Sequence, residues 1–395
     1  MQKLLAILWW FVLPLAVWGG VASWACGQDS LEGGSWSGKI TATADAPGSS
    51  LTDFFYVVQI DSSQTQFWAA VQNDGDDVRA SVDGTQVPCW VDPATFNYAG
   101  QSCIVYVMRS GAASSAPVIC IYFGNAGASL PAAGATYGQY NTFPSSLKAF
   151  YPCGGGNDVT SNANNLTMTG SPTVGGVAGP ISGSLATDYN GTTQYGTAAS
   201  ATIASGPPAT IFAHANHDTN ATQVVIGIGN AQPSLMYRIG AGNLYELFLS
   251  GVGGNAYSAS AVSTGSWASS AGASSSTTSR IMYRNGTAGT AATTNMTSNW
   301  AAAIRVGARP DNAASPMDGK IAFAGVYSVA ASADWLAYWH NMLADPDQSD
   351  FYNGWTYASI SSTIVPLLQR MQLMSLVRPT QWDRFVSLTP IMLEK

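Results

Sequence analysis

Short apolar runs, each bounded by turn-forming residues, recur along most of this chain and restrict what it can fold into. In the first third, six runs rich in β-branched and aromatic residues are separated by stretches of Gly, Asp, Asn, Pro and Ser. Such runs, with turns about every eight to fifteen residues, are typical of antiparallel sheets and not of alternating strand–helix units. The six predicted strands cover 54–60, 67–72, 78–82, 87–91, 103–108 and 118–123.

A second group of such runs extends from about residue 147 to 329. Within it, 258–279 consists almost entirely of Ser, Ala, Thr and Gly, which predicts an exposed hairpin. Helical spacing occurs only near the C-terminus, where Asp334 is predicted to cap a helix over 335–344. The predicted fold class is all-β with short C-terminal helices. The predicted divisions are a small β-sandwich at 33–126, a Gly/Ala/Ser-rich linker at 127–142, a second β domain at 147–345 and a tail at 346–395.

The charge of the chain excludes one class of partner. It has 15 Lys and Arg residues against 22 Asp and Glu, a net charge of −7, and only 9% of its residues are charged. A protein that reads nucleic-acid phosphates needs a dense basic surface, so nucleic acid is not expected as a partner. Because 46% of the residues are hydrophobic, the chain can bury a sizeable core, which argues against general disorder.

The first 25 residues have the pattern of a secretory signal peptide. Lys3 precedes an apolar run at 4–21, and small residues at 23 and 25 suit cleavage after Ala25. The alternative is an uncleaved membrane anchor, because this run just reaches the length of a span. Cys26 follows the cleavage point, where bacterial lipoproteins are acylated, although the residues before it depart from the usual lipobox. We expect a secreted or cell-surface protein that contacts a membrane only through such a lipid or anchor.

The other four cysteines are Cys89, Cys103, Cys120 and Cys153. No pair has Cys-x-x-Cys spacing and no histidine lies nearby in the sequence, so a zinc site has little support. Export permits disulfides, and Cys89 and Cys103, which flank a loop between two apolar runs, are predicted to form one. The alternative is that the cysteines are buried and free, particularly Cys120 within an apolar strand.

An ordered set of motifs occupies residues 36–125. It comprises WSGKIT (36–41), LTDF (51–54), DDVR (76–79), DGT (83–85) and IYFGN (121–125). In this order the motifs resemble an uncharacterised bacterial β-sandwich family that often precedes laminin-G-like domains in exported proteins. That family has no established chemistry, so the resemblance implies a fold and a context only.

A second ordered set lies further along the chain. It comprises FYP (150–152), DYNG (188–191), Trp267, MYRNG (282–286), IRVG (304–307) and DGKI (318–321). This set resembles the laminin-G-like, concanavalin A-type jelly roll over roughly 147–345. The resemblance implies recognition of carbohydrate or an extracellular polymer, with calcium as the cofactor to consider. One departure is that Ala322 and Phe323 stand where many relatives carry an acidic pair.

Concanavalin A-type folds also include glycoside hydrolases, which need two carboxylates at the scissile bond. The only glutamates are Glu32, Glu246 and Glu394, and the first and last lie near the ends of the chain. Glu246 therefore has no glutamate partner, and hydrolysis by this mechanism is disfavoured. No Gly-x-Ser-x-Gly motif supports a serine nucleophile either.

Two kinds of metal site can be considered. His214 and His217 form a weak motif with Asp218, for which a polar loop is the more common explanation, while His340 is expected to pack. Calcium could be held near 345–350 or near 73–77, where acidic residues cluster. Neither segment has the spacing of an EF-hand.

Four arginines, Arg280, Arg284, Arg305 and Arg309, fall in or beside two predicted strands. Alternation places the two arginines of each strand on one face, and if the strands are neighbours the four form a basic patch. Guanidinium groups suit sulfate, carboxylate or phosphate, so the patch is a predicted ligand site. The alternative is a solvated outer face of the sheet.

Together these features favour a non-catalytic exported recognition protein that binds carbohydrate or an extracellular polymer through its jelly roll. A second interpretation is a structural or adhesive module of a cell surface or virus particle that contacts other proteins. A glycoside hydrolase is the least favoured function.

Overall fold

The computed structural model describes residues 31–360, apart from 33, 53, 110–113, 200, 204, 231–233, 250–253, 296–299 and 301–302. The predicted signal peptide at 1–25, the lipid on Cys26 and the part of the predicted tail after residue 360 lie outside the described residues. None of the helices described is both long enough and apolar enough to cross a bilayer.

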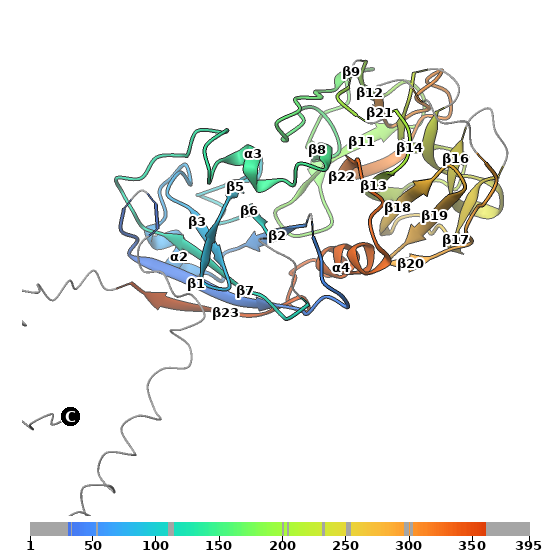
Figure 1. The fold of residues 1–395 in the computed structure, drawn as a ribbon. Helices are drawn as coiled ribbons and strands as arrows, with labels where there is room; N and C mark the ends of the chain where they lie inside the picture. Colours follow the sequence, from blue (N-terminus) through green and yellow to red (C-terminus); the bar gives the residue numbers. More distant parts are fainter. Residues whose placement is uncertain are drawn as a thin grey trace, which may run out of the picture. The chain divides into compact units, whose positions relative to one another are not determined.

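Two antiparallel sheets form the first β domain (Figure 1). Their elements are β1 (Gly38–Ala44), β2 (Phe55–Ile60), α2 (Thr65–Ala70), β3 (Arg79–Val82), β4 (Thr85–Val87), β5 (Cys89–Val91), β6 (Cys103–Met108), β7 (Val118–Phe123) and β23 (Tyr352–Ser359). One sheet has the order β23-β1-β7-β3-β4 and the other β2-β6-β5. Alternate residues of β1 are buried in the same apolar core as β2 and β6, namely Ile40, Ala42 and Ala44.

Two predicted strands of this domain are wrong. The run at 87–91 is not one strand, because Val87 ends β4 whereas 89–91 form β5, which lies in the other sheet. The run at 67–72 lies largely in α2, where Phe67 and Trp68 are buried while Ala69 and Ala70 are exposed. Phe67 packs against Phe123 of β7, with ring centroids 5.0 Å apart. A short apolar run has no periodicity that separates helix from strand, and here packing decides in favour of the helix.

The last strand, β23, comes from the segment assigned to the tail. It pairs antiparallel with β1, with Ile40 opposite Tyr357. Most of its side chains are exposed, so no apolar alternation marks it in the sequence. Backbone hydrogen bonds to β1 place it in the sheet, which corrects the assignment of 352–359 to a tail.

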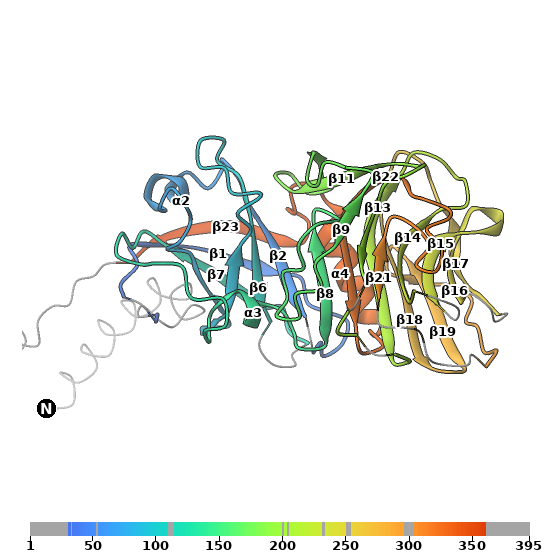
Figure 2. The same ribbon diagram turned by 90° about the horizontal axis from the view of Figure 1, so that it is seen from above.

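The second β domain is a jelly roll of two antiparallel sheets, which Figure 2 shows from above. One sheet has the order β10-β11-β22-β13-β18-β19-β20, with β8 also paired to β22, and the other has the order β17-β16-β15-β14-β21-β12-β9. A single apolar core lies between them. Its elements, with helix α3 before them, are α3 (Gln139–Thr142), β8 (Leu147–Pro152), β9 (Thr167–Thr169), β10 (Val177–Ala178), β11 (Leu185–Asn190), β12 (Tyr195–Ala198), β13 (Ala209–His217), β14 (Val224–Ile228), β15 (Leu235–Ile239), η1 (Ala241–Asn243), β16 (Leu244–Leu249), β17 (Ala256–Ala261), β18 (Trp267–Ser276), β19 (Ser279–Arg284), β20 (Thr287–Ala288), β21 (Ile304–Val306) and β22 (Asp318–Tyr327).

The Ser/Ala/Gly-rich segment is not an exposed hairpin. It contains β17 and β18, which lie in different sheets, and most residues of β18 are buried between β13 and β19. The small residues permit close packing, because a Cβ on Gly272 would lie 2.3 Å from a side-chain carbon of Leu247 in the opposite sheet. The predicted all-β class is confirmed, whereas this hairpin prediction is wrong.

Helix α4 (Ala333–Ala344) follows the jelly roll and joins the two β domains. Its cap is Ser332 and not Asp334, since the Ser332 hydroxyl accepts a hydrogen bond from the Trp335 N–H at 3.1 Å. Trp339 is 2% exposed and lies 5.5 Å from Phe55 of β2 and 5.4 Å from Phe212 of β13 between ring centroids. A single apolar cluster therefore extends from the first β domain to the outer face of the jelly roll.

We expect Trp339→Ala to lower the free energy of unfolding by about 3–5 kcal/mol, because it removes a buried ring that both β domains contact. Chemical denaturation monitored by circular dichroism measures this loss. Trp339→Phe should cost less, and Leu130→Ala, at a side chain 53% exposed, should change stability little. A Trp339→Ala protein as stable as Leu130→Ala would contradict the assignment of this helix as the join.

Candidate functional site

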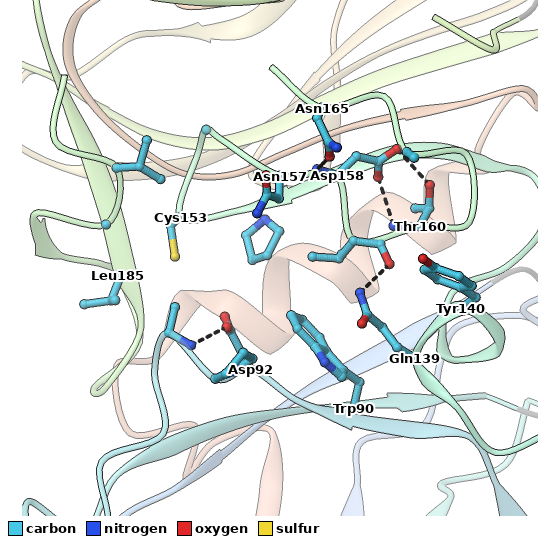
Figure 3. Close-up of a pocket in the computed structure, with 18 residues that line it drawn as sticks. Trp90, Asp92, Gln139, Tyr140, Cys153, Asn157, Asp158, Thr160, Asn165 and Leu185 are labelled. Atoms are coloured by element: carbon cyan, nitrogen blue, oxygen red, sulfur yellow. Dashed lines mark hydrogen bonds between the residues drawn. The ribbon is translucent and has the colours of Figure 1, made fainter. Parts of the chain in front are cut away.

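A cleft of about 520 Å³, here called the Trp90 cleft, lies between the end of β5, helix α3 and the loops at the start of the jelly roll. In Figure 3, Trp90 and Asp92 lie on one side, while Asn157 and Asn165 lie on the other. Tyr140 of α3, 39% exposed, stands at one end. The cleft thus combines two aromatic rings with carboxylate and amide groups.

Asp158 shapes the jelly-roll side of this cleft. Its Oδ1 accepts hydrogen bonds from the backbone N–H groups of Phe150 and Thr160, at 3.0 and 2.9 Å. Its Oδ2 accepts from the Thr160 hydroxyl at 3.0 Å and the Asn164 N–H at 2.8 Å. Four donors occupy the carboxylate, which fixes the loop on which the neighbouring Asn157 and Asn165 stand. Burial raises the pKa of Asp158, and these hydrogen bonds oppose that rise.

The turn that leads into this loop requires glycine. Cys153 and Gly154 follow β8 with φ angles of 70° each. A Cβ on Gly154 would lie 2.0 Å from the carbonyl oxygen of Ile321, so no larger residue fits without moving the backbone. This close approach holds the beginning of the loop against β22.

Asp92 is the carboxylate on the opposite side that keeps a free oxygen. Its Oδ1 accepts from the Ala94 N–H at 2.9 Å. Its Oδ2 is buried and has no hydrogen-bond partner among the described residues, and the residue is 3% exposed. Burial raises the pKa of Asp92 to about 6, opposed by the hydrogen bond from Ala94. An unpaired buried oxygen is costly, so a ligand hydroxyl that bonds to it would relieve that cost.

The polar groups of the Trp90 cleft suit a neutral, hydroxylated ligand. No Lys, Arg or His is among the described residues that line it. Asn157 is exposed, and no described residue is hydrogen-bonded to its side chain, while Asn165 uses its Oδ1 to accept from the Asp158 N–H at 2.9 Å. Amide donors therefore remain opposite the Asp92 carboxylate, without a cation to attract an anionic group.

The four predicted arginines do not form one patch. β19 and β21 lie in different sheets, so the assumption that they are neighbours is wrong. Arg280 is fully buried and donates to the backbone carbonyls of Thr277, Thr294 and Gly254, and Arg284 donates to the Ser260 hydroxyl at 2.8 Å. Arg284 thereby connects β19 to β17 of the opposite sheet, and Arg280 connects it to the segment just before β17.

The other two arginines are also held by neighbours. Arg305 donates to the Thr197 hydroxyl at 3.0 Å and lies over the ring of Tyr195, 5.0 Å from its centroid. Arg309 pairs with Asp311 at 2.7 Å. Binding of a ligand by any single arginine of the four stays a prediction.

The predicted Cys89–Cys103 disulfide is also wrong, because both cysteines are free. Cys89 of β5 stands opposite Val107 of β6, whereas Cys103 begins β6 four residues earlier. Four residues of a strand separate two positions by about 13 Å, far beyond the reach of a disulfide.

The other two cysteines differ from each other. Cys153 is free as well, while Cys120 is disulfide-bonded, contrary to the alternative that it is free. Burial, with the Asp92 charge, raises the pKa of Cys153 to about 12, so its thiol stays protonated.

The histidines do not converge on a metal. His214 faces α4, with its Nδ1 2.8 Å from the Ser269 hydroxyl, whereas His217 lies near Tyr245 inside the jelly roll. Their odd spacing on β13 puts them on opposite faces, and Asp218 instead pairs with Lys320 at 3.0 Å. Burial lowers the pKa of His214 to about 3 and that of His217 to about 4. Among the residues that the structure describes, no carboxylate is hydrogen-bonded to His214.

In each of the two acidic clusters considered for calcium, one carboxylate is already held by local hydrogen bonds. Asp77 is fully buried and its two oxygens accept from the backbone N–H groups of Gln72, Gly124 and Asn125. In the other cluster, Asp345 accepts from Ser349 and Asp350 within its own turn. Across the residues that the structure describes, no three acidic, histidine or cysteine side chains group as a metal site would require.

Sequence reasoning missed the residues of the Trp90 cleft. The one local signal is that Asp92 directly follows an apolar strand, where a buried carboxylate is unusual. Tyr140 and Asn157 come from segments far from it in sequence, and only the packing of the two β domains brings them to one cleft.

Comparison with known proteins agrees with the jelly roll. Residues 190–337, less than half of the chain, match a laminin-G family model described as the concanavalin A-like lectin/glucanases superfamily. No curated protein matches the sequence. The predicted concanavalin A-like jelly roll is therefore confirmed for this part of the chain.

Several solved structures are similar to part of this chain. Domain 4 of AbnA, an extracellular GH43 arabinanase from Geobacillus stearothermophilus in complex with arabinotriose, has 17% identity and a TM-score of 0.39, over 48% of this chain and 96% of that one. The CBM40 of a Ruminococcus gnavus IT-sialidase bound to α2,3-sialyllactose has 16% identity and a TM-score of 0.28, over 34% and 83%. The receptor-binding domain of a botulinum neurotoxin C/D mosaic serotype has 11% identity and a TM-score of 0.38, over 49% and 51%.

The raised pKa of Asp92 predicts that the free energy of unfolding depends on pH. Between about pH 4 and 6 the carboxyl is protonated in the folded protein but ionised in the unfolded one, so this group lowers stability as pH rises. We expect Asp92→Asn to equal the wild type near pH 4 and to exceed it by about 2–3 kcal/mol above pH 6.5. Urea denaturation of both proteins between pH 4 and 7.5 measures the difference. A difference that stays constant over this range would contradict the buried ionisation.

Proposed function

We propose that this protein is a non-catalytic recognition protein that binds a neutral carbohydrate in the Trp90 cleft. The observation that carries this proposal is the free, buried Oδ2 of Asp92 in a cleft that has aromatic rings and amides but no basic side chain among its described lining. The ligand therefore needs hydroxyl donors and apolar C–H faces, and it gains nothing from negative charge.

The aromatic residues supply the apolar contact. Trp90 is supported from within by Tyr106, stacked at 5.5 Å between ring centroids, so its ring is held rigidly beside the cleft. Tyr140 is 39% exposed at the end of the cleft and can meet the C–H face of a sugar ring. Rigid, amphipathic rings of this kind give contact area at low cost in conformational entropy.

The polar residues supply direction. An ionised Asp92 accepts hydrogen bonds from ligand hydroxyls, and the Asn157 and Asn165 amides can donate to ligand oxygens from the opposite side. A few placed polar groups around an apolar surface are the usual composition of a small-molecule site.

The groups in and near the cleft support binding without catalysis. A two-carboxylate hydrolase needs an acid and a nucleophile or base, but Asp158 has all its positions occupied by four hydrogen bonds. Asp92 is thus left without a second available carboxylate in the described lining. Glu246, the one glutamate inside the jelly roll, is 2% exposed and pairs with Arg238 at 2.7 Å. We extend this proposal to an exported protein, as the pattern of residues 1–25 predicts.

The test is titration of the full chain by calorimetry with neutral oligosaccharides, chosen first from an array of glycans. We expect Tyr140→Ala to weaken binding about tenfold, because it removes a stacking face worth roughly 1.4 kcal/mol. The same ligand carrying a uronic acid should bind more weakly than its neutral form, since the Asp92 charge repels it. Both measurements are made at pH 7.

Tyr98→Ala is the matched control, because Tyr98 is similarly exposed at 38% and lies outside the cleft. Equal affinities for Tyr140→Ala and Tyr98→Ala would move the ligand away from this cleft. An array without any bound glycan would overturn the proposal and favour the structural or adhesive module.

A further inference from the structure

A second groove of about 530 Å³ lies in the first β domain and shares no lining residue with the Trp90 cleft. Its lining comes from β1, the end of β2, the start of α2 with the turn before it, the segment after α4 and strand β23. We call it the β23 groove. Its lining residues are Ile40, Gln59, Asp61, Ser63, Gln64, Gln66, Asp347, Gln348, Ser349, Tyr352, Gly354, Trp355 and Tyr357.

Two buried glutamines of the β23 groove differ in how far their side-chain amides are hydrogen-bonded. Gln348 is 2% exposed and fully bonded: its Oε1 accepts from the Gln59 N–H at 2.9 Å, and its Nε2 donates to the carbonyls of Val57 and Met342. The side chain of Gln59 is 5% exposed, yet neither its Oε1 nor its Nε2 has a partner among the described residues. A buried amide with a free donor and a free acceptor is costly, which marks it as a group reserved for a ligand.

Aromatic rings form one wall of the groove. The hydroxyl of Tyr352 donates to the carbonyl of Val57 at 2.9 Å, and its ring lies 5.7 Å from the ring of Trp355. Tyr357 is 45% exposed and stands further along β23. Tyr352 is fixed by its hydrogen bond and Tyr357 is open to solvent, so the rings offer flat surfaces beside the side-chain amide of Gln59.

The remaining lining determines the class of ligand. Asp61 and Asp347 are the charged residues among the described lining, and no Lys or Arg accompanies them. An anionic ligand would be repelled. Ile40 is the one aliphatic residue of the described lining, and its side chain is only 2% exposed. The groove therefore lacks an open aliphatic pocket for a peptide side chain. Amides, carboxylates and ring faces together suit hydroxyl groups and the C–H face of a sugar.

We propose that the β23 groove is a second carbohydrate site, which takes a neutral saccharide with Gln59 as the bidentate polar contact and Trp355 and Tyr357 as the stacking surface. This site is independent of the Trp90 cleft, since it draws on different residues. If both bind one polysaccharide, the second contact becomes intramolecular and the affinity for the polymer exceeds that for a short oligosaccharide.

The test uses the full chain in native gels that contain soluble neutral polysaccharides, namely arabinan, galactomannan, xyloglucan and mixed-linkage β-glucan. The cleft is first weakened by Asp92→Asn together with Tyr140→Ala. We expect this double variant to retain binding to at least one polysaccharide, and we expect Gln59→Leu or Trp355→Ala to lower the remaining association constant at least tenfold. Tyr98→Ala in the same background should leave the constant unchanged.

Gln59→Leu separates binding from folding. Leucine has nearly the same size but no polar atom to leave unpaired, so its thermal midpoint should equal or exceed that of the wild type. Loss of binding in a protein of undiminished stability is the expected result. A lowered midpoint would contradict the free state of the Gln59 amide.

The outcomes distinguish the two sites. Complete loss of binding in the double cleft variant overturns the second site and leaves the Trp90 cleft standing. Full binding in that variant, lost with Gln59→Leu, supports the β23 groove and removes the Trp90 cleft. Absence of binding by the wild type to every polysaccharide, or retention on a peptide array instead, overturns the ligand class of the groove.

Discussion

Trp335 and Trp339 lie one turn apart on α4 and stack with their ring centroids 5.7 Å apart, and the join between the two β domains depends on this pair. Residues four apart on a helix share a face, so a single turn presents both rings to the surrounding sheets. Trp339 contacts Phe55 on one side and Phe212 on the other. The Trp90 cleft takes residues from both domains, so it too depends on the packing of one domain on the other.

Composition and periodicity were enough to predict the all-β class, and the order of motifs was enough to predict the concanavalin A-like jelly roll. They failed where tertiary packing overrides local pattern. β18 is built from small residues because Leu247 approaches Gly272 closely, a contact that no local composition reveals. The strand β23 has mostly exposed side chains, so its place in the sheet follows from backbone pairing with β1 and from the buried Tyr352, and neither is visible as a pattern in the sequence.

The candidate sites were harder to predict than the fold. Alternation correctly places Arg280 and Arg284 on one face of β19, because both donate toward the segment around β17. Which strands are neighbours was the unknown, and β19 and β21 belong to different sheets. Each of the two candidate sites contains a buried polar group, Asp92 or Gln59, with side-chain atoms that have no hydrogen-bond partner among the described residues. The sequence cannot reveal such a missing partner, because it does not show which residues surround these side chains.

The pairing of β1 with β23 makes the jelly roll an insertion within the first β domain. Thr41 and Thr356, which are bonded across this pair, lie 315 positions apart. During synthesis the first domain therefore has an open sheet edge at β1 while the whole jelly roll emerges. Such edges pair readily with other chains, and contacts of long sequence separation form slowly. The jelly roll, whose strands all lie between residues 147 and 327, has no such dependence on β23, so the domain that begins the chain is the last to be completed.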